Sequence, residues 1–356
     1  MSLNWAILGA GNISGSFVHD LCLNNERNER VKHIVKSIGS SSRSRGEEFI
    51  QRNKITTENN HGVVPQVQSY DELYANPDVD IIYIGTPHPM HKEQVTKGLS
   101  HGKHILCEKP FTLNAKDAQQ LIDLAREKNL YLLEGVWTRF FPSIAKLKEL
   151  IFEEKALGDI NRLVMDFSFD ADLANIPETS RIRSNELGGG ALLDIGVYNL
   201  TYTRILLDNK LGKNATKFDV KSFQTIDPKD KVDFTSSMLV KYENGKQAVL
   251  TCSNHVPRPE PYLRLDGTKG YLEMFSENPA SPQKFKVTFK DGRDAIEYED
   301  TSGYIGFIYE ANACYDDISN GRTESDVMPH DETMLVMNMM DDIRKESGLR
   351  YAADDW

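Results

Sequence analysis

Short apolar runs alternate with amphipathic stretches over the first third of the chain. This alternation predicts strands at residues 5–8, 33–38, 79–84, 104–106 and 130–133. The clearest helical pattern between them covers residues 114–128, where Asn114 suits the N-cap and Asp117 lies in the first turn. Strands separated by helices are typical of parallel βαβ units, in which ligands bind at the carboxyl ends of the strands. The first third therefore predicts a doubly wound α/β domain.

The pattern changes after about residue 137. One helical stretch, 142–154, is followed by segments with a period of two, which predict strands at residues 161–169, 219–225, 234–242, 246–252, 262–265 and 284–289. Two further helices are expected at 304–320 and 332–346. A chain of 356 residues suits about two domains. We therefore expect a doubly wound domain over residues 1–136 and an α+β domain, with a large and mostly antiparallel open sheet, over residues 137–356.

Composition excludes several classes of partner. The formal net charge of −11 disfavours nucleic acid, because an acidic surface repels polyphosphates. No apolar stretch approaches the roughly 20 residues that span a bilayer, and no secretory signal is seen, so a cytoplasmic chain without a membrane anchor is expected. The cysteines stand far apart and are expected to be free thiols: Cys22, Cys107, Cys252 and Cys314.

A glycine turn follows the first expected strand. Gly9 permits a tight turn, and Gly11 lets backbone N–H groups approach a pyrophosphate at the start of the next helix. The third glycine of the G-x-G-x-x-G pattern is replaced by Ser14. The strand before and the helix after this turn favour dinucleotide binding over a plain turn, with Gly9, Gly11, Asn12 and Ile13 as contacts.

The segment after the second expected strand bears on the choice of nicotinamide cofactor. It reads Gly39-Ser40-Ser41-Ser42-Arg43-Ser44-Arg45 and holds no acid for a free ribose 2′-hydroxyl. Hydroxyl and guanidinium groups suit a 2′-phosphate, so Ser41, Ser42 and Arg43 predict NADP over NAD. The alternative is a solvated loop without a role in binding.

Two further segments carry groups for proton chemistry. Lys109, in Cys107-Glu108-Lys109-Pro110 at a strand end, can stabilise an alkoxide, and the proline leaves a cis peptide bond possible. Asp194 and Tyr198 follow three glycines, and their i, i+4 spacing puts them on one helical face. The alternatives are a solvated lysine and a hydrogen-bonded core pair, and Tyr202 competes with Tyr198 for any phenol role.

Together these segments resemble the glucose-fructose oxidoreductase and inositol dehydrogenase family (Gfo/Idh/MocA) over essentially the whole chain. The matching segments are Gly9-x-Gly11-x-Ile13-x-x-x-Phe17, Thr86-Pro87-His88-x-x-His91, Glu108-Lys109-Pro110, the glycine segment with Asp194, and Gly267-Thr268-Lys269-Gly270. The segment Trp137-Thr138-Arg139-Phe140-Phe141-Pro142 and Tyr198 are similar to the branch of dimeric dihydrodiol dehydrogenases and D-xylose dehydrogenases. The resemblance implies an N-terminal Rossmann domain that binds NAD(P).

The resemblance also implies roles for individual residues. Tyr198 would be the general acid and base, Lys109 would stabilise its anion, and Asp194 would orient the substrate. Further cofactor contacts would come from Thr86, Pro87, His88, His91, Glu108 and Lys109. Trp137 and Phe140 would form apolar walls, whereas Arg139 and Arg181 would hold substrate oxygens or merely pair with acids. The spacing of His88 and His91 lacks a third ligand nearby, so no metal is predicted.

The sequence therefore predicts an NADP-dependent oxidoreductase that acts on a hydroxyl of a sugar, polyol or trans-dihydrodiol. Two alternatives remain open at this point, a non-catalytic NAD(P)-binding regulatory protein and a redox-assisted glycoside-cleaving enzyme on the same fold. A homodimer or higher homo-oligomer formed through the second domain's sheet is also expected.

Overall fold

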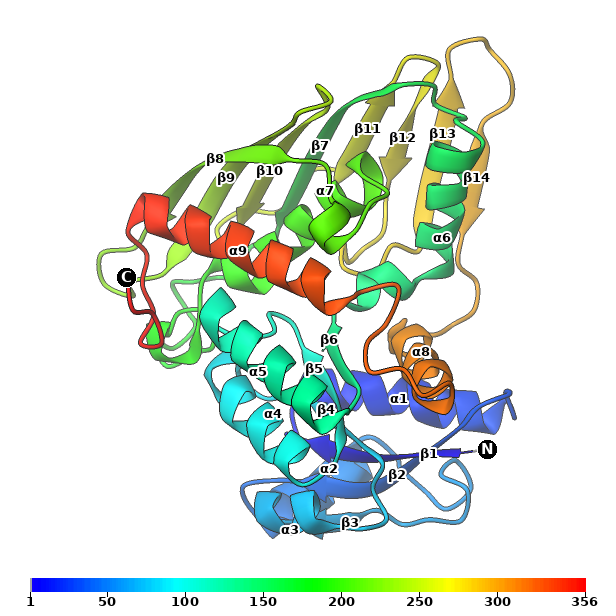
Figure 1. The fold of residues 1–356 in the computed structure, drawn as a ribbon, viewed down its shortest axis with the longest axis vertical. Helices are drawn as coiled ribbons and strands as arrows, with labels where there is room; N and C mark the ends of the chain where they lie inside the picture. The colour runs from blue at the N-terminus through cyan, green and yellow to red at the C-terminus, as the bar shows by residue number, and fades with distance from the viewer. Residues whose placement is uncertain (1) are drawn as a thin grey trace. The chain divides into compact units, whose positions relative to one another are not determined.

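A computed structural model describes residues 2–356, and in it the chain forms two compact units (Figure 1). The first unit contains the chain up to Thr112, Lys116–Trp137 and Gly303–His330. The second contains Leu113–Ala115, Thr138–Ser302 and Asp331–Trp356. The sequence predicted domains over residues 1–136 and 137–356, whereas in the structure Gly303–His330 also belongs to the first unit.

The first unit is built on a parallel sheet. Its strands, within the described residues, are β1 (Ser2–Leu8), β2 (Lys32–Gly39), β3 (Gln66–Gln68), β4 (Ile81–Ile84), β5 (His104–Glu108) and β6 (Leu132–Gly135). Their order is β3-β2-β1-β4-β5-β6, with every neighbouring pair parallel. This order confirms the doubly wound fold, in which ligands bind where the order reverses, between β1 and β4. The short strand β3 was not expected, because its sequence Gln-Val-Gln contains no apolar run.

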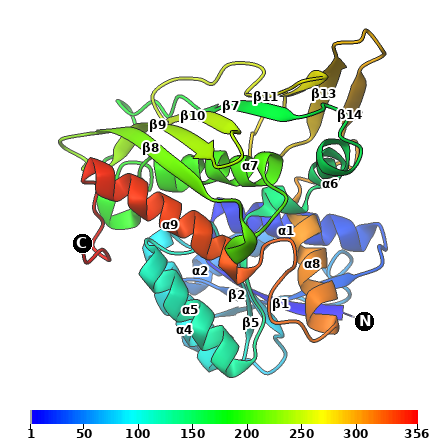
Figure 2. The same cartoon turned by 45° about the horizontal axis from the view of Figure 1, so that its top comes forward.

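Helices connect and cover these strands. They are α1 (Asn12–Glu26), α2 (Arg43–Arg52), α3 (Tyr70–Ala75), α4 (His91–Ser100), α5 (Ala115–Lys128) and α8 (Phe307–Ser319). Helices α4 and α5 lie side by side in both views, and α8 lies against α1 (Figures 1 and 2).

Two contacts explain why α8 belongs to the first unit. The buried carboxylate of Asp20, on α1, accepts the backbone N–H groups of Ile305 at 2.9 Å and Gly306 at 2.8 Å. It also accepts the Ile308 N–H, in the first turn of the helix, at 3.3 Å, and so caps the N-terminus of α8. The Phe307 ring also stacks on Trp137, with ring centroids 4.2 Å apart. Both partners are distant in sequence, so no local pattern could have indicated this packing.

The second unit is built on a sheet of eight strands within residues 2–356. The strands are β7 (Ile160–Ser168), β8 (Phe218–Ile226), β9 (Asp233–Tyr242), β10 (Gln247–Ser253), β11 (Leu263–Gly267), β12 (Gly270–Met274), β13 (Lys284–Phe289) and β14 (Ile296–Glu299). Their order is β14-β13-β12-β11-β7-β10-β9-β8, and within this sheet, as far as the structure describes it, only the pair β7 and β10 is parallel. The mostly antiparallel sheet is therefore confirmed. The short strands β12 and β14 were not anticipated.

Helices cover one face of this sheet, as Figure 2 shows for α7 and α9. The second unit's helices are α6 (Pro142–Lys148), α7 (Val197–Leu207) and α9 (His330–Ser347), with π-helical turns at Glu149–Glu153 and Leu192–Gly196. Side chains alternate along β9, where Met238 and Val240 are buried and Leu239 is exposed. In the described residues, no helix is both long and apolar enough to cross a membrane.

Candidate active site

The glycine turn after β1 has the geometry of an anion-binding helix start. Gly9 has a φ of +103°, and a side chain there would meet Thr86 Cγ2 at 2.9 Å. Gly11 is the N-cap of α1, where no side chain caps the helix and no acid lies in the first turn. The backbone N–H groups of the first helical turn are therefore left without a side-chain cap, and the side chains of Asn12 and Ile13 beside them are exposed. The turn therefore fits the pyrophosphate of a dinucleotide.

Ser14, which replaces the third glycine, leaves this geometry intact. In the usual motif that glycine permits close packing of the helix on the strands. Here Ser14 is buried, and its hydroxyl lies where a side chain on Gly85 would be. Gly85 follows β4 and has no Cβ, so it supplies the space that the missing third glycine would have supplied. The glycine itself is visible in the sequence, in Gly85-Thr86-Pro87. Its contact with Ser14 could not be predicted, because the two residues are far apart along the chain.

The serine-rich segment after β2 is the start of a helix and not only a solvated loop. The Ser42 hydroxyl accepts the Arg45 N–H at 3.4 Å and caps α2, which begins at Arg43. Arg43 is exposed and its Nε donates to Glu47 at 2.8 Å, while Arg45 donates to the Ser41 hydroxyl at 3.3 Å. Two guanidinium groups and a capped helix start thus lie beyond the carboxyl end of β2.

His91 ties together the turns that follow β4 and β5. Its Nε2 lies 2.9 Å from the carbonyl oxygen of Thr86, and its Nδ1 lies 3.1 Å from that of Pro110. Burial lowers the pKa of the ring, so the neutral form is favoured. The sequence predicted His91 as a cofactor contact. In the structure its nitrogens face main-chain carbonyls, so it fixes the turns that carry Thr86, His88 and Lys109.

Lys109 itself follows β5 and is half-buried. The Lys109–Pro110 peptide bond is cis, which the sequence left open. The turn is held from the β6 side as well, because the Phe111 N–H donates to Glu134 Oε1 at 3.1 Å. The lysine therefore stands on a turn that is fixed on both sides, which is what a catalytic group requires.

Two buried carboxyl groups lie beneath this turn. The Tyr83 hydroxyl donates to Glu108 Oε1 at 2.6 Å, and burial raises the pKa of Glu108. Glu310, on α8, is fully buried, and neither of its carboxyl oxygens has a hydrogen-bond partner among the described residues. Burial and the neighbouring Glu108 carboxylate raise the pKa of Glu310 well above its usual value. Burial therefore favours the protonated form of at least one carboxyl group of this pair.

The sequence did not indicate Glu310 as a candidate site residue. A signal was present, because Glu310 shares a helical face with Phe307, Ala311 and Cys314, and a carboxyl group interrupts that apolar stripe. Its position near Glu108 depends on α8 packing in the first unit, which the sequence did not reveal.

In the second unit, Asp194 and Arg181 lie together. Arg181 Nη1 is 3.0 Å from Asp194 Oδ2, and Arg181 remains more than half exposed while Asp194 is largely buried. Asp194 lies in the π-helical turn and Tyr198 in the first turn of α7, where its ring packs near Phe167 with centroids 5.5 Å apart. The i, i+4 spacing predicted that both residues lie on one helical face, and the structure adds a π turn at the start of that helix. A π turn inside a helix is frequent at functional sites.

Asp233, at the start of β9, anchors this helix. Its buried carboxylate accepts the Leu192 N–H at 2.8 Å and the Ser236 hydroxyl at 2.7 Å. Burial raises the pKa of Asp233 to about 6, although both hydrogen bonds oppose that shift. Gly190 lies against Asp233 with a φ of +110°, so no side chain fits there. The glycine segment thus serves the approach of Asp233 to the helix start.

Tyr202 is excluded as the competing phenol. It is fully buried, and its hydroxyl donates to the Pro279 carbonyl at 2.8 Å and lies 3.3 Å from the Tyr262 hydroxyl. Burial raises the pKa of Tyr202 well above its usual value. A group in this environment is a structural hydrogen-bonding residue and not a base at neutral pH.

Three of the residues expected to contact the substrate divide between the two units. Trp137 belongs to the first unit, where its ring stacks on Phe307. Arg139 and Phe140 belong to the second. Arg139 is buried and donates to Glu332 Oε1 at 2.6 Å, so it has the acid-pairing role that the sequence left as its alternative. Phe140 is half-buried at the end of a short 3₁₀ turn, Trp137–Phe140.

Comparison with protein families agrees with this geometry. A model described as an oxidoreductase family with an NAD-binding Rossmann fold matches residues 3–136, and the Gfo/Idh/MocA C-terminal domain matches residues 144–273. The chain belongs to the Gfo/Idh/MocA family. It is thus an oxidoreductase with a Rossmann fold for NAD(P), as the sequence motifs predicted.

Relatives of this Gfo/Idh/MocA protein extend over its full length. A trans-1,2-dihydrobenzene-1,2-diol dehydrogenase of Xenopus tropicalis is 32% identical over 99% of this chain and 100% of the relative. A D-xylose 1-dehydrogenase (NADP(+)) of Hypocrea jecorina is 31% identical over 98% and 93%. Among solved structures, a 3-ketoreductase from Actinomadura kijaniata in complex with NADP shares the fold with a TM-score of 0.79, at 21% identity over 98% of both chains.

Proposed function

We propose that the protein is an NADP-dependent dehydrogenase that oxidises a hydroxyl group of a sugar, polyol or trans-dihydrodiol, or reduces the corresponding carbonyl group. The names of the full-length relatives, a dihydrodiol dehydrogenase and an NADP-linked xylose dehydrogenase, support this class of substrate. Ser41, Ser42 and Arg43 at the start of α2 support NADP over NAD, because they offer hydroxyl and guanidinium donors to a 2′-phosphate.

The other cofactor contacts follow from the turns already described. The N–H groups at Gly11, Asn12 and Ile13 would hold the pyrophosphate, and Thr86, Pro87 and His88 would contact the nicotinamide ribose. When bound, the nicotinamide ring accepts or gives a hydride at C4. His91 and Glu108 would act by holding the turns on which the contacting groups stand.

The proton chemistry would belong to Tyr198 and Lys109. As the substrate's C–H bond loses its hydride, the hydroxyl proton passes to the Tyr198 oxygen, and a carbonyl group is left. A phenol with a pKa near 10 is a poor base at neutral pH unless a nearby cation stabilises its anion. The Lys109 ammonium would provide that charge, and in the reverse direction it would stabilise the alkoxide as Tyr198 returns the proton.

The Asp194 carboxylate would orient the substrate by accepting hydrogen bonds from the substrate's hydroxyl groups. Arg181 would hold that carboxylate in place. The observation that carries the proposal is this pair at 3.0 Å beside the helix start that bears Tyr198. A purely regulatory nucleotide-binding protein has no need of an acid, a base and a fixed lysine on prepared turns.

Absorbance of reduced nicotinamide tests the proposed function. We expect turnover with NADP and at least one member of a panel of aldoses, polyols and trans-dihydrodiols. Binding of NADPH, seen by its fluorescence, without turnover across the whole panel would instead favour a regulatory protein.

We also propose that the protein is cytoplasmic and forms a homodimer through the open face of the second unit's sheet. Leu239, Val249 and Val164 are direct neighbours across β9, β10 and β7, and all three are exposed. Phe223 on β8 is 84% exposed beside them. An exposed apolar row of this kind is typical of a protein interface.

A further inference from the structure

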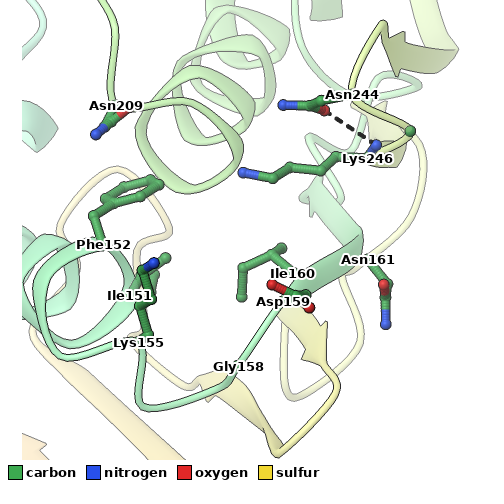
Figure 3. A pocket seen from close by; sticks show the side chains of 11 residues that line it. Ile151, Phe152, Lys155, Gly158, Asp159, Ile160, Asn161, Asn209, Asn244 and Lys246 are labelled. Atoms are coloured by element: carbon green, nitrogen blue, oxygen red, sulfur yellow. Dashed lines mark hydrogen bonds between the residues drawn. The ribbon is translucent and has the colours of Figure 1, made fainter.

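A hollow of about 580 Å³ lies in the second unit, and none of the residues assigned above to catalysis or cofactor binding lines it (Figure 3). It is formed by the π-helical turn after α6, the loop before β7, the loop after α7 and the turn between β9 and β10. Its lining residues are Ile151, Phe152, Lys155, Gly158, Asp159, Ile160, Asn161, Asn209, Asn244, Gly245 and Lys246. A cavity of this volume accommodates a small ligand.

Lys246 is the central polar group of the hollow. Figure 3 shows its side chain reaching across toward Phe152, and its Nζ lies 5.8 Å from the centroid of that ring. The half-buried ammonium donates to the Leu207 carbonyl at 2.7 Å. An ammonium has three N–H donors, so this bond leaves capacity for a ligand. Burial lowers the pKa of Lys246, and a bound anion would relieve that cost.

The remaining polar groups point to a ligand with several hydroxyls. The side chains of Asn209 and Asp159, which line the hollow, make no hydrogen bond to other described residues, and they supply both donors and acceptors. Among the lining side chains, the two lysines, Lys155 and Lys246, exceed the single acid, Asp159, by one charge. The Asp208 carboxylate also acts on Lys246, but it is itself paired with Arg204, so the lining favours a monoanion. Phe152 and Ile160 offer an apolar wall for the C–H groups of a sugar.

We propose that this hollow binds a small polyhydroxylated carboxylate of the sugar-acid type. Its carboxylate contacts Lys246, and its hydroxyl groups contact Asn209, Asn244 and Asp159. The same ammonium holds the last carbonyl of α7, so the occupant lies at the opposite end of this 11-residue helix from Tyr198. The proposal concerns binding alone and does not depend on the proposed dehydrogenase activity.

Isothermal titration calorimetry of the full chain, without added nicotinamide cofactor, tests the proposal with D-gluconate as the probe. We expect saturable binding that is weakened about tenfold or more in Lys246→Met, since a charge-assisted hydrogen bond is lost. Asn209→Ala and Lys155→Ala change exposed side chains and should also weaken binding, which keeps the test decisive if Lys246→Met folds poorly. Lys241→Met, an exposed lysine on β9 outside the hollow, is the matched control and should bind normally.

Two further arms separate the alternatives. D-glucose should bind more weakly than gluconate if the carboxylate is recognised, and inorganic phosphate should bind more weakly if the hydroxyls and the Phe152 wall contribute. If the heat of gluconate binding is lost in Asp194→Asn but retained in Lys246→Met and Asn209→Ala, gluconate binds outside this hollow. That result would overturn the proposal. Absence of saturable heat, or equal affinity for phosphate and gluconate, would overturn it too.

Discussion

At the scale of single residues, the sequence identified groups whose neighbours along the chain explain them. Gly9, Gly11, Lys109, Asp194 and Tyr198 could be selected because each stands in a short motif at a predictable strand or helix end. Other residues depend on partners far away in the sequence, and no local pattern announced their roles. His91 bridges two turns, Asp233 anchors a helix start, and Glu310 lies near Glu108.

The Asp233 carboxyl group gives the stability of the protein a pH dependence. Its pKa rises from 3.8 to about 6 on folding, so the folded state binds more protons than the unfolded state between these values. Stability is therefore lost as the pH rises through this window, by about 3 kcal/mol for a shift of about two units. In Asp233→Asn this loss disappears. Urea unfolding between pH 4 and 7 should show that the free energy of unfolding of the variant rises relative to that of the wild type as the pH rises. A difference in free energy that stays constant with pH would contradict the raised pKa of Asp233.

Arg43 tests the choice of cofactor. It is exposed and makes only a surface ion pair with Glu47, so its replacement should leave the fold unchanged. Arg43→Asp should raise the KM for NADPH about tenfold or more, because an acid now faces the 2′-phosphate, while the KM for NADH changes little. Arg52→Asp, at the other end of α2, is the control. An unchanged preference in Arg43→Asp would remove Arg43 from the site.

At the scale of elements, regular strands and amphipathic helices followed from hydrophobic period and end signals. The π-helical turn at Leu192–Gly196 did not, because the spacing of apolar residues does not distinguish a π turn from an α-helical one. The turn is tightly packed, since a side chain on Gly196 would meet Leu192 and Cys252 at about 3 Å. The short strands β3 and β14 were not predicted either, because three or four residues are too few to show an alternation of apolar and polar side chains.

The start of α9 is held by a buried ion cluster. Glu332 accepts hydrogen bonds from Arg139 at 2.6 Å, from Arg204 at 3.2 Å and from the Gly212 N–H at 2.8 Å. Although burial opposes it, the two guanidinium groups lower the pKa of Glu332. Glu332→Ala leaves both cations without this partner and should lower the free energy of unfolding by about 3–5 kcal/mol.

Thermal and urea unfolding would measure the Glu332→Ala effect, with Glu243→Ala in the exposed β9–β10 turn as the control that should change little. A loss no larger than that of the control would show that Arg139 and Arg204 find other partners. Arg139 would then be available for the substrate contact that the sequence first suggested.

At the scale of the whole molecule, the sequence indicated two architectures and their order, but not that Gly303–His330 returns to the first unit. Period and turn signals describe local structure, whereas this return depends on the cap that Asp20 supplies and on the stacking of Phe307. The exposed sheet face, by contrast, could be anticipated, because an open sheet with apolar residues on both faces must be covered.

The sheet face predicts a change of oligomeric state. Leu239→Lys combined with Val249→Lys puts two charges into the apolar row and should convert a dimer into a monomer in light scattering after size-exclusion chromatography. Val256→Lys, at an exposed apolar position outside the strands, should not change the mass. A wild-type monomer, or a dimer that survives both charges, would contradict the proposed interface.

The central claim is that Lys109 and Tyr198 act as one unit on the reacting hydroxyl, and the most direct test is the kcat of Lys109→Met, Tyr198→Phe and the double variant. We predict that each single change lowers kcat by about 100-fold or more, and that the double variant is hardly slower than either single one. Single variants that turn over at nearly the wild-type rate, or losses that multiply fully in the double variant, would contradict the claim.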